Sequence, residues 1–187
     1  MYPAIFLDRD GVIIENRADY VRSWEDVSIF PQALEALAKY STISHKIVLI
    51  TNQSAVGRGI LTLETAWEIN HRLVERIEAA GGRVDGVYLC PHAPEQDCDC
   101  RKPRPGLILQ AARELEIDLD RSIMIGDALT DIMAGQAGGV GCVVLVRSGR
   151  GARQATLPRP DHMAPFPVFD TLADALDRLL GEHSECR

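Results

Sequence analysis

Two aspartates close to the first residue are spaced for chemistry on a phosphate group. Asp8 and Asp10 follow the apolar run 4–7, and the side-chain period of two in an extended segment puts both carboxylates on the same side. Adjacent carboxylates repel each other unless a cation or a shared proton relieves the cost, and Mg²⁺, which prefers oxygen ligands, is a suitable cation. One carboxylate can then attack phosphorus while its neighbour handles the leaving-group proton. By itself, the tetrapeptide that ends in Gly11 is more typical of a turn.

Polar side chains follow three further predicted strands. The segment 51–54 offers hydroxyl and amide donors for a phosphoryl oxygen, although by itself it is only a polar turn. Arg101 and Lys102 could neutralise the charge that develops on a transferring phosphoryl group. Asp127 could supply another oxygen to the same Mg²⁺, and Asp131 could support it or begin a helix. The order of these groups, each just past a predicted strand, favours one shared phosphate site.

A loop rich in cysteine lies directly before Lys102. Cys90, His92, Cys98 and Cys100 supply three thiolates and one imidazole, which form a closed tetrahedral shell for Zn²⁺. Because the protein fills all four positions, such a zinc would be structural. The alternative is a loop of reduced cysteines without a metal. A metal clip here would hold the adjacent cations over the phosphate at a low entropy cost.

These residues need elements to position them, and two hydrophobic periods alternate along the chain. We expect strands at 4–7, 46–50, 84–89, 122–125 and 142–146. We expect helices from Pro31, from Thr62 to about 81–82, from Pro105, after Thr130 and over 172–180. This alternation predicts one doubly wound α/β domain over 1–187, with a parallel sheet covered on both faces. Ligands of such sheets bind beyond the carboxyl ends of the strands, where the polar groups lie.

The remainder of the chain narrows the class of protein. The segment 147–167 is expected to be an irregular surface. Its arginines could contact a ligand phosphate, but we expect them in solvent. The formal charge of −7 argues against broad nucleic-acid binding, which needs a basic surface. No apolar run approaches the ~20 residues of a membrane span, and the chain enters its first strand without a charged leader. We therefore expect binding to neither nucleic acid nor membrane. The clustered cysteines favour a reducing cytoplasm, and we expect a monomer because no sustained apolar surface stripe is left over.

The sequence resembles the haloacid dehalogenase-like phosphohydrolases over roughly residues 4–146. The four motifs of that family match Asp8-x-Asp10-Gly11, Thr51, Lys102 and Gly126-Asp127-x-x-x-Asp131. The resemblance implies that Asp8 is the nucleophile and that Asp10 is the general acid, then the base for the attacking water. It implies that Thr51 and Lys102 hold the phosphoryl group. It places Mg²⁺ on Asp8, the main-chain carbonyl of Asp10, and Asp127.

The lengths of the connections indicate which phosphohydrolases are most similar. Roughly twenty residues separate Asp10 from Pro31, so a separate cap domain has no room there, nor within the cysteine loop. That loop resembles two capless groups, the heptose 1,7-bisphosphate phosphatases and the histidinol-phosphate phosphatases. The segments 51–59 and 102–106 are more similar to the heptose group. This resemblance implies removal of a 7-phosphate on the way to a nucleotide-activated heptose. It implies substrate contacts from Asn16, Arg17, Ala18, Asp19, Asn52, Gln53, Ser54 and Arg101.

Two alternatives of other classes stay open. A phospho-receiver domain also combines acids, magnesium, a hydroxyl and a lysine on a parallel sheet, but its phospho-accepting aspartate ends the third strand, where this chain has Cys90. A receiver would retain a long-lived aspartyl phosphate. A zinc-binding interaction module would show no dependence on magnesium.

Overall fold

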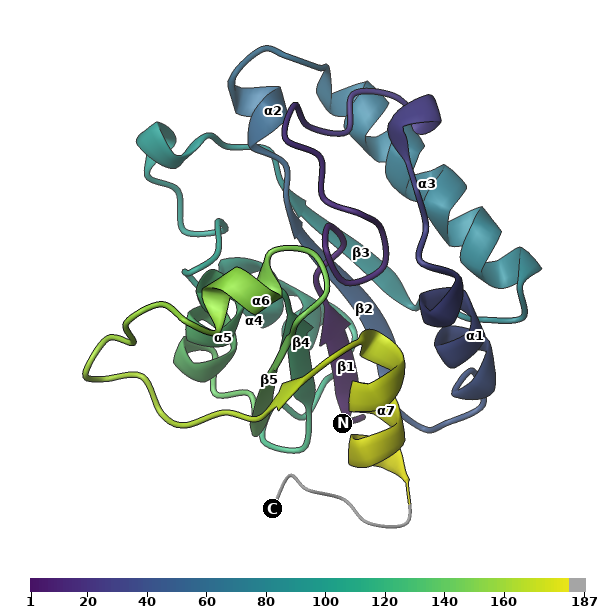
Figure 1. Ribbon diagram of the computed structural model, residues 1–187, viewed down its shortest axis with the longest axis vertical. Helices are drawn as coiled ribbons and strands as arrows, with labels where there is room; N and C mark the ends of the chain where they lie inside the picture. The colour runs from purple at the N-terminus through teal and green to yellow at the C-terminus, as the bar shows by residue number, and fades with distance from the viewer. Residues whose placement is uncertain (182–187) are drawn as a thin grey trace.

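The computed structural model describes residues 1–181 and arranges them around one parallel sheet (Figure 1). The strands are β1 (Ala4–Leu7), β2 (Lys46–Asn52), β3 (Gly86–Cys90), β4 (Ile123–Gly126), β5 (Cys142–Val146) and β6 (Val168–Phe169). Their order in the sheet is β3-β2-β1-β4-β5-β6, and every pairing is parallel. This architecture confirms the predicted doubly wound α/β fold.

Within the described residues, seven helices connect or follow the strands. They are α1 (Pro31–Lys39), α2 (Ser54–Gly57), α3 (Leu63–Ala79), α4 (Gly106–Glu114), α5 (Leu129–Ala137), α6 (Gly151–Gln154) and α7 (Leu172–Leu180), with 3-10 turns at Trp24–Asp26 and Pro94–Gln96. The Thr62 hydroxyl caps α3 by accepting a 3.0 Å hydrogen bond from the Thr65 amide, as its position before an apolar stripe predicts. Within residues 1–181, no helix combines the length and apolar character needed to cross a membrane.

The sheet is buried on both faces, which explains why its strands are apolar throughout. On one face, Ile5 and Leu7 pack against apolar side chains of α1, α3 and α7. On the other face, Ala4 and Phe6 pack against those of α4 and α5. The same two helix layers flank the sheet in Figure 1. The alternation along β1 is therefore an alternation between two cores.

The structure differs from the expected elements mainly at strand ends and in the later part of the chain. β2 runs through Asn52 instead of stopping at Ile50, and β3 spans Gly86–Cys90 instead of 84–89. α4 begins one residue after Pro105. The segment 147–167, which was expected to be irregular, contains the four-residue helix α6. The two-residue strand β6 begins at Val168, directly after this segment. Both are too short to produce a readable hydrophobic period.

The position of β1 determines where the loops converge. The chain proceeds from β1 to β2 and β3 on one side, and later to β4 and β5 on the other. β1 and β4 are hydrogen-bonded neighbours, with Leu7 opposite Ile125. The loops that leave the carboxyl ends of these two strands diverge to opposite faces, which is the location where open α/β sheets bind ligands.

Candidate active site

A buried lysine joins two carboxylates at the carboxyl edge of the sheet. Lys102 Nζ lies 2.8 Å from Asp8 Oδ1 and 2.7 Å from Asp131 Oδ1. It donates a third hydrogen bond, of 2.7 Å, to the carbonyl of Ile50. These acceptors use all three donors of the ammonium group. All three charged side chains are almost fully buried, so each charge depends on its partners here.

Asp131 serves both the helix that follows β4 and the lysine. Its Oδ2 accepts a 3.0 Å hydrogen bond from the amide of Ala128, the residue that precedes α5. Carboxylates at this position satisfy amides that the first helical turn leaves free. Its other oxygen binds Lys102. The sequence left open whether Asp131 begins a helix or supports the site, and the structure shows that it does both.

Three carboxylates form a cluster whose chemistry fits a divalent cation. Asp8, Asp127 and Asp131 each bring an oxygen within 4.8 Å of the others. Burial raises the pKa of Asp8 to about 6; Lys102 opposes this increase, while the charges of Asp131 and Asp10 add to it. Burial, followed by the charge of Asp8, also raises the pKa of Asp127. Buried oxygen ligands with excess negative charge suit a small hard cation such as Mg²⁺.

The carboxylate of Asp10 belongs to a separate set of contacts and is oriented by a buried arginine. Arg9 is 1% exposed, and it donates to Asp10 Oδ2 from Nε at 3.0 Å and to Oδ1 from Nη2 at 3.1 Å. Its Nη1 donates to Asn70 Oδ1 of α3 at 2.9 Å. Gln53 Nε2 adds a 3.1 Å hydrogen bond to Asp10 Oδ2. Because a guanidinium fork fixes both the position and the plane of a carboxylate, Asp10 is held in one orientation.

Two glycines let the loops after β1 and β5 meet at Asp127. Gly11 has φ +89° and Gly149 has φ +59°, a conformation that side chains rarely adopt. A Cβ on Gly149 would lie 2.4 Å from the Gly11 Cα and 2.2 Å from Asn16 Oδ1. The Ser148 hydroxyl joins the loops by donating a 2.6 Å hydrogen bond to the Gly11 carbonyl. The loop after β5 is therefore part of the site.

A pocket of about 260 Å³ opens over the cluster. The predicted substrate residues that line it are Asn16, Arg17, Asn52, Gln53, Ser54 and Arg101, and the predicted catalytic residues that do so are Asp8, Asp10 and Lys102. Ala18 and Asp19 are exposed and lie outside the lining, and Tyr20 lines the pocket instead. The substrate contacts expected of Ala18 and Asp19 therefore stay predictions that the lining of this pocket does not support. Thr51 is buried, and its Oγ1 accepts a 2.7 Å hydrogen bond from Gln53 Nε2.

Arg150 is a pocket residue that the sequence did not single out. Its main-chain amide lies 2.8 Å and its Nε 3.3 Å from Asp127 Oδ2, and its Nη2 lies 3.1 Å from Oδ1. Arg150 is exposed, as expected for the arginines of 147–167, but it also contacts a buried carboxylate of the site, which was not expected. Arg147 is exposed as well, and it pairs with the exposed Asp170 at 2.9 Å. The missed signal was the location of Arg150 just past a strand, at the same edge as the other site residues.

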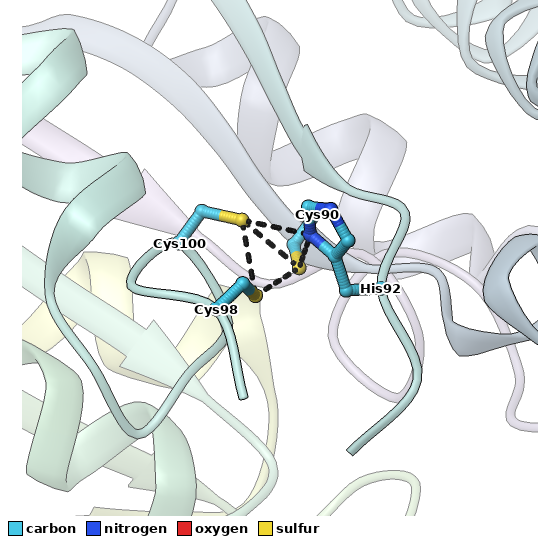
Figure 2. A group of neighbouring side chains, drawn as sticks. All are labelled: Cys90, His92, Cys98 and Cys100. Atoms are coloured by element: carbon cyan, nitrogen blue, oxygen red, sulfur yellow. Dashed lines mark hydrogen bonds between the residues drawn. The ribbon is translucent and has the colours of Figure 1, made fainter. Parts of the chain in front are cut away.

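The cysteine loop brings its four predicted ligands together (Figure 2). Five of the distances between the sulfurs of Cys90, Cys98 and Cys100 and His92 Nδ1 lie between 3.2 and 3.6 Å. A tetrahedral zinc with thiolate and imidazole ligands separates its ligand atoms by about 3.5–3.8 Å. Burial raises the pKa of the Cys90 thiol, so this sulfur needs a bound cation to ionise at neutral pH. The four residues could hold one metal ion.

Hydrogen bonds connect this loop to the pocket. Arg101 Nη1 donates to the His92 carbonyl at 3.2 Å. The Asn52 amide accepts from the Lys102 main-chain amide and donates to the Lys102 carbonyl, both at 3.1 Å. The end of β2 and the cysteine loop therefore both determine where Lys102 enters the site.

Comparison with known proteins agrees with this geometry. A family model described as HAD-hydrolase-like matches residues 99–175. A D-glycero-beta-D-manno-heptose-1,7-bisphosphate 7-phosphatase of Helicobacter pylori (strain J99) is 47% identical over 133 residues, which are 71% of this chain and 76% of the relative. The protein of the same name from Pseudomonas aeruginosa is 36% identical, over 94% of this chain and 97% of the relative.

A solved structure extends the similarity to the whole fold. The D,D-heptose 1.7-bisphosphate phosphatase from B. bronchiseptica, complexed with magnesium and phosphate, superposes with a TM-score of 0.87 at 34% identity. The match covers 96% of this chain and 99% of that chain. The similarity thus spans nearly the whole chain, including both layers of helices. The chain belongs to the D-glycero-beta-D-manno-heptose-1,7-bisphosphate 7-phosphatase family of haloacid dehalogenase-like phosphomonoester hydrolases.

Proposed function

We propose that this protein removes the 7-phosphate of D-glycero-β-D-manno-heptose 1,7-bisphosphate and leaves the 1-phosphate, a step toward nucleotide-activated heptose. The observation that carries the proposal is the buried cluster of Asp8, Lys102 and Asp131 at the pocket, in a chain whose relatives are named for this reaction. The β anomer follows the names of those relatives.

Asp8 is the nucleophile in this proposal. One of its oxygens bonds to phosphorus as the bond from phosphorus to the sugar oxygen breaks. Thr51 and Lys102 hold the phosphoryl oxygens during this transfer, and Lys102 releases its hydrogen bond to Asp8 to do so. Asp10, oriented by Arg9, gives its proton to the departing sugar oxygen. Asp10 then takes a proton from the water that attacks phosphorus, which releases phosphate and restores the Asp8 carboxylate.

Mg²⁺ is the cation that we assign to the carboxylate cluster. Asp8, Asp127 and the main-chain carbonyl of Asp10 would hold it, and the short distances among the carboxylates support the first two. When bound, it neutralises the charge of the nucleophile and of the phosphoryl group. Asp131, although close enough to belong to the cluster, is already engaged by Lys102 and the amide before α5.

Zn²⁺ is the metal that we assign to Cys90, His92, Cys98 and Cys100. The set of three sulfurs and one imidazole nitrogen and its compact spacing support this choice. A filled shell of four protein ligands gives the zinc a structural role. It stiffens the loop that carries Arg101 and Lys102, of which Arg101 contacts the substrate in this proposal.

We further propose that residues 1–187 form a single domain that acts as a monomer in the cytoplasm on a small phosphorylated sugar. Among residues 1–181, six large apolar side chains are exposed, which is little compared with an obligate interface. A reducing compartment would keep the cysteine cluster free to bind metal.

The test is phosphate release from heptose 1,7-bisphosphate, with histidinol phosphate in parallel, with and without Mg²⁺. We expect a kcat/KM for the heptose that is higher by two orders of magnitude or more, with the 1-phosphate retained in the product as followed by ³¹P NMR. A preference for histidinol phosphate would keep the mechanism and refute the substrate. A stable phosphorylated protein without phosphate release would indicate a receiver domain, and activity without Mg²⁺ would refute the metal assignment.

A further inference from the structure

One carboxylate of the cluster is paired with a side chain that reaches it from the solvent side. Asp127 is fully buried, whereas the side chain of Arg150 is 57% exposed. The guanidinium of Arg150 contacts both oxygens of Asp127, at 3.1 and 3.3 Å, and its main-chain amide contacts one of them at 2.8 Å. A single residue therefore balances this buried charge.

The other two carboxylates have a different kind of partner. Asp8 and Asp131 share Lys102, which is 3% exposed and has all three of its donors engaged. Because Lys102 is buried, its side chain cannot move into solvent. Arg150 differs because its long side chain can leave Asp127 by rotating toward the pocket that it lines. The cluster thus holds one fixed cation and one exchangeable cation.

The net charge of the cluster indicates that Arg150 occupies the place of a divalent cation. Three carboxylates face two single positive charges, Lys102 and Arg150, so one negative charge remains in excess. If a divalent ion replaced the guanidinium, the cluster would be neutral. Two cations on one small carboxylate would repel each other, which disfavours simultaneous binding.

We infer that Arg150 is the exchangeable counter-cation of Asp127, and that its guanidinium must leave this carboxylate for a divalent metal ion to bind. The inference rests on the metal site of the proposed function. The main chain does not need to move, because the Ser148 hydroxyl anchors this loop to the Gly11 carbonyl at 2.6 Å. By linkage, the free energy with which Arg150 stabilises the metal-free protein is lost from the free energy of metal binding.

The competition has two signatures that are independent of turnover. Without metal, loss of the Arg150 side chain leaves the buried Asp127 carboxylate with the main-chain amide but without a cation, and this lowers the melting temperature. With metal, the same loss removes a competitor, so the affinity for Mg²⁺ increases, by roughly tenfold. The difference in melting temperature should therefore disappear or reverse sign in saturating Mg²⁺.

The experiment compares Arg150→Ala with Arg153→Ala, which removes an exposed arginine from the same short helix α6. Mg²⁺ binding is measured by isothermal titration calorimetry, and melting is measured in EDTA and in saturating Mg²⁺. We expect tighter Mg²⁺ binding and a lower melting temperature in EDTA for Arg150→Ala, with wild-type values for Arg153→Ala. Arg150→Gln, which keeps an uncharged amide donor, provides the same comparison if the alanine variant does not fold.

Two results would overturn the inference in distinguishable ways. If Arg150→Ala binds Mg²⁺ as the wild type does or more weakly, Arg150 does not compete for Asp127, and this inference fails alone. If the wild-type protein binds no Mg²⁺, the metal site of the proposed function fails and the inference fails with it.

Discussion

At the scale of single residues, the site is a set of buried charges, each with a defined partner. Lys102 lies between Asp8 and Asp131, and Arg9 holds both oxygens of Asp10. Buried charges that lose a partner are strongly destabilising, because the remaining charge has no solvent to turn to. Substitutions at these positions therefore separate residues that react from residues that hold others in place.

Asp8→Asn is expected to lower kcat by roughly 10⁴-fold or more, because an amide oxygen is a poor nucleophile. The fold should survive, since Lys102 keeps Asp131 and the Ile50 carbonyl and an unfavourably buried charge is removed. Phosphate release and a melting curve test this prediction. Asp161→Asn, at an exposed aspartate outside the pocket lining and without a predicted role, is the matched control. Retained turnover in Asp8→Asn would refute the nucleophile assignment.

Asn70→Ala tests whether the contact of α3 with Arg9 positions Asp10. It leaves a buried guanidinium N–H without its acceptor, at a cost of about 1–3 kcal/mol, and should lower kcat with little change in KM. Asn70→Asp keeps an acceptor for Arg9, and within residues 1–181 the lost Nδ2 donor has no partner, so this variant should recover most of kcat. Stopped-flow kinetics over pH checks both variants. Equal losses in kcat for the two would show that Asn70 only fills space.

At the scale of elements, loops from both halves of the sheet supply the site. The β3 side contributes the cysteine loop with Arg101 and Lys102, and the β5 side contributes Gly149 and Arg150. Neither loop is a long helix or strand, so the position of each depends on a few local contacts. A single metal ion bound by the four ligands would hold the cysteine loop in place. The hydrogen bond from Ser148 to the loop after β1 holds the loop after β5.

Removal of zinc from the cysteine loop should lower the melting temperature by several degrees and reduce kcat/KM roughly tenfold or more. The physical reason is that Lys102 follows Cys100 by two residues, so a loosened loop no longer delivers the ammonium at one position. A strong chelator followed by gel filtration prepares the stripped protein, and addition of Zn²⁺ should restore both values. Unchanged melting and unchanged turnover after verified metal loss would contradict a structural zinc.

Packing of β3 on α4 gives a prediction for high pH. Burial and then the hydrogen bond to Glu114, 2.9 Å long, raise the pKa of Tyr88 from 10 to about 12. Since the folded pKa lies above the unfolded value, this contribution to stability is complete below pH 10 and is lost as pH rises through 12. Urea unfolding of the wild type and Tyr88→Phe should differ by about 1–2 kcal/mol below pH 10 and converge above it. A pH-independent difference would argue against this ionisation.

At the scale of the whole molecule, alternating periods predicted the sheet because its core strands are apolar on both faces. The same pattern predicted the location of the site, since Asp8, Lys102 and Asp127 follow strands whose carboxyl ends share one edge. The cysteine cluster was predictable because its ligands lie within one short loop. In each case, local order along the chain determined which groups would meet.

What the sequence did not reveal depends on long side chains and on irregular chain. Arg9 is buried although charged, because Asp10 and Asn70 accept its hydrogen bonds. Spacing along the sequence cannot predict a hydrogen-bond acceptor that lies 61 residues away. Arg150 belongs to a segment without a period, so its approach to Asp127 depends on the paired glycines. The predicted substrate segment 16–19 lies in irregular chain, so no hydrophobic period indicated that Tyr20 lines the pocket while Ala18 and Asp19 do not.

In the proposed mechanism, the function of the whole molecule depends on one covalent event, the transfer of a phosphoryl group to Asp8. The direct measurement is acid quench of Asp10→Asn mixed with Mg²⁺ and p-nitrophenyl phosphate, whose leaving group departs without a proton, followed by peptide mass spectrometry. We predict one phosphoryl group on the peptide that contains Asp8, and none in a variant that also carries Asp8→Asn. Release of nitrophenol without a phosphorylated Asp8, or a phosphoryl group on another residue, would contradict the mechanism.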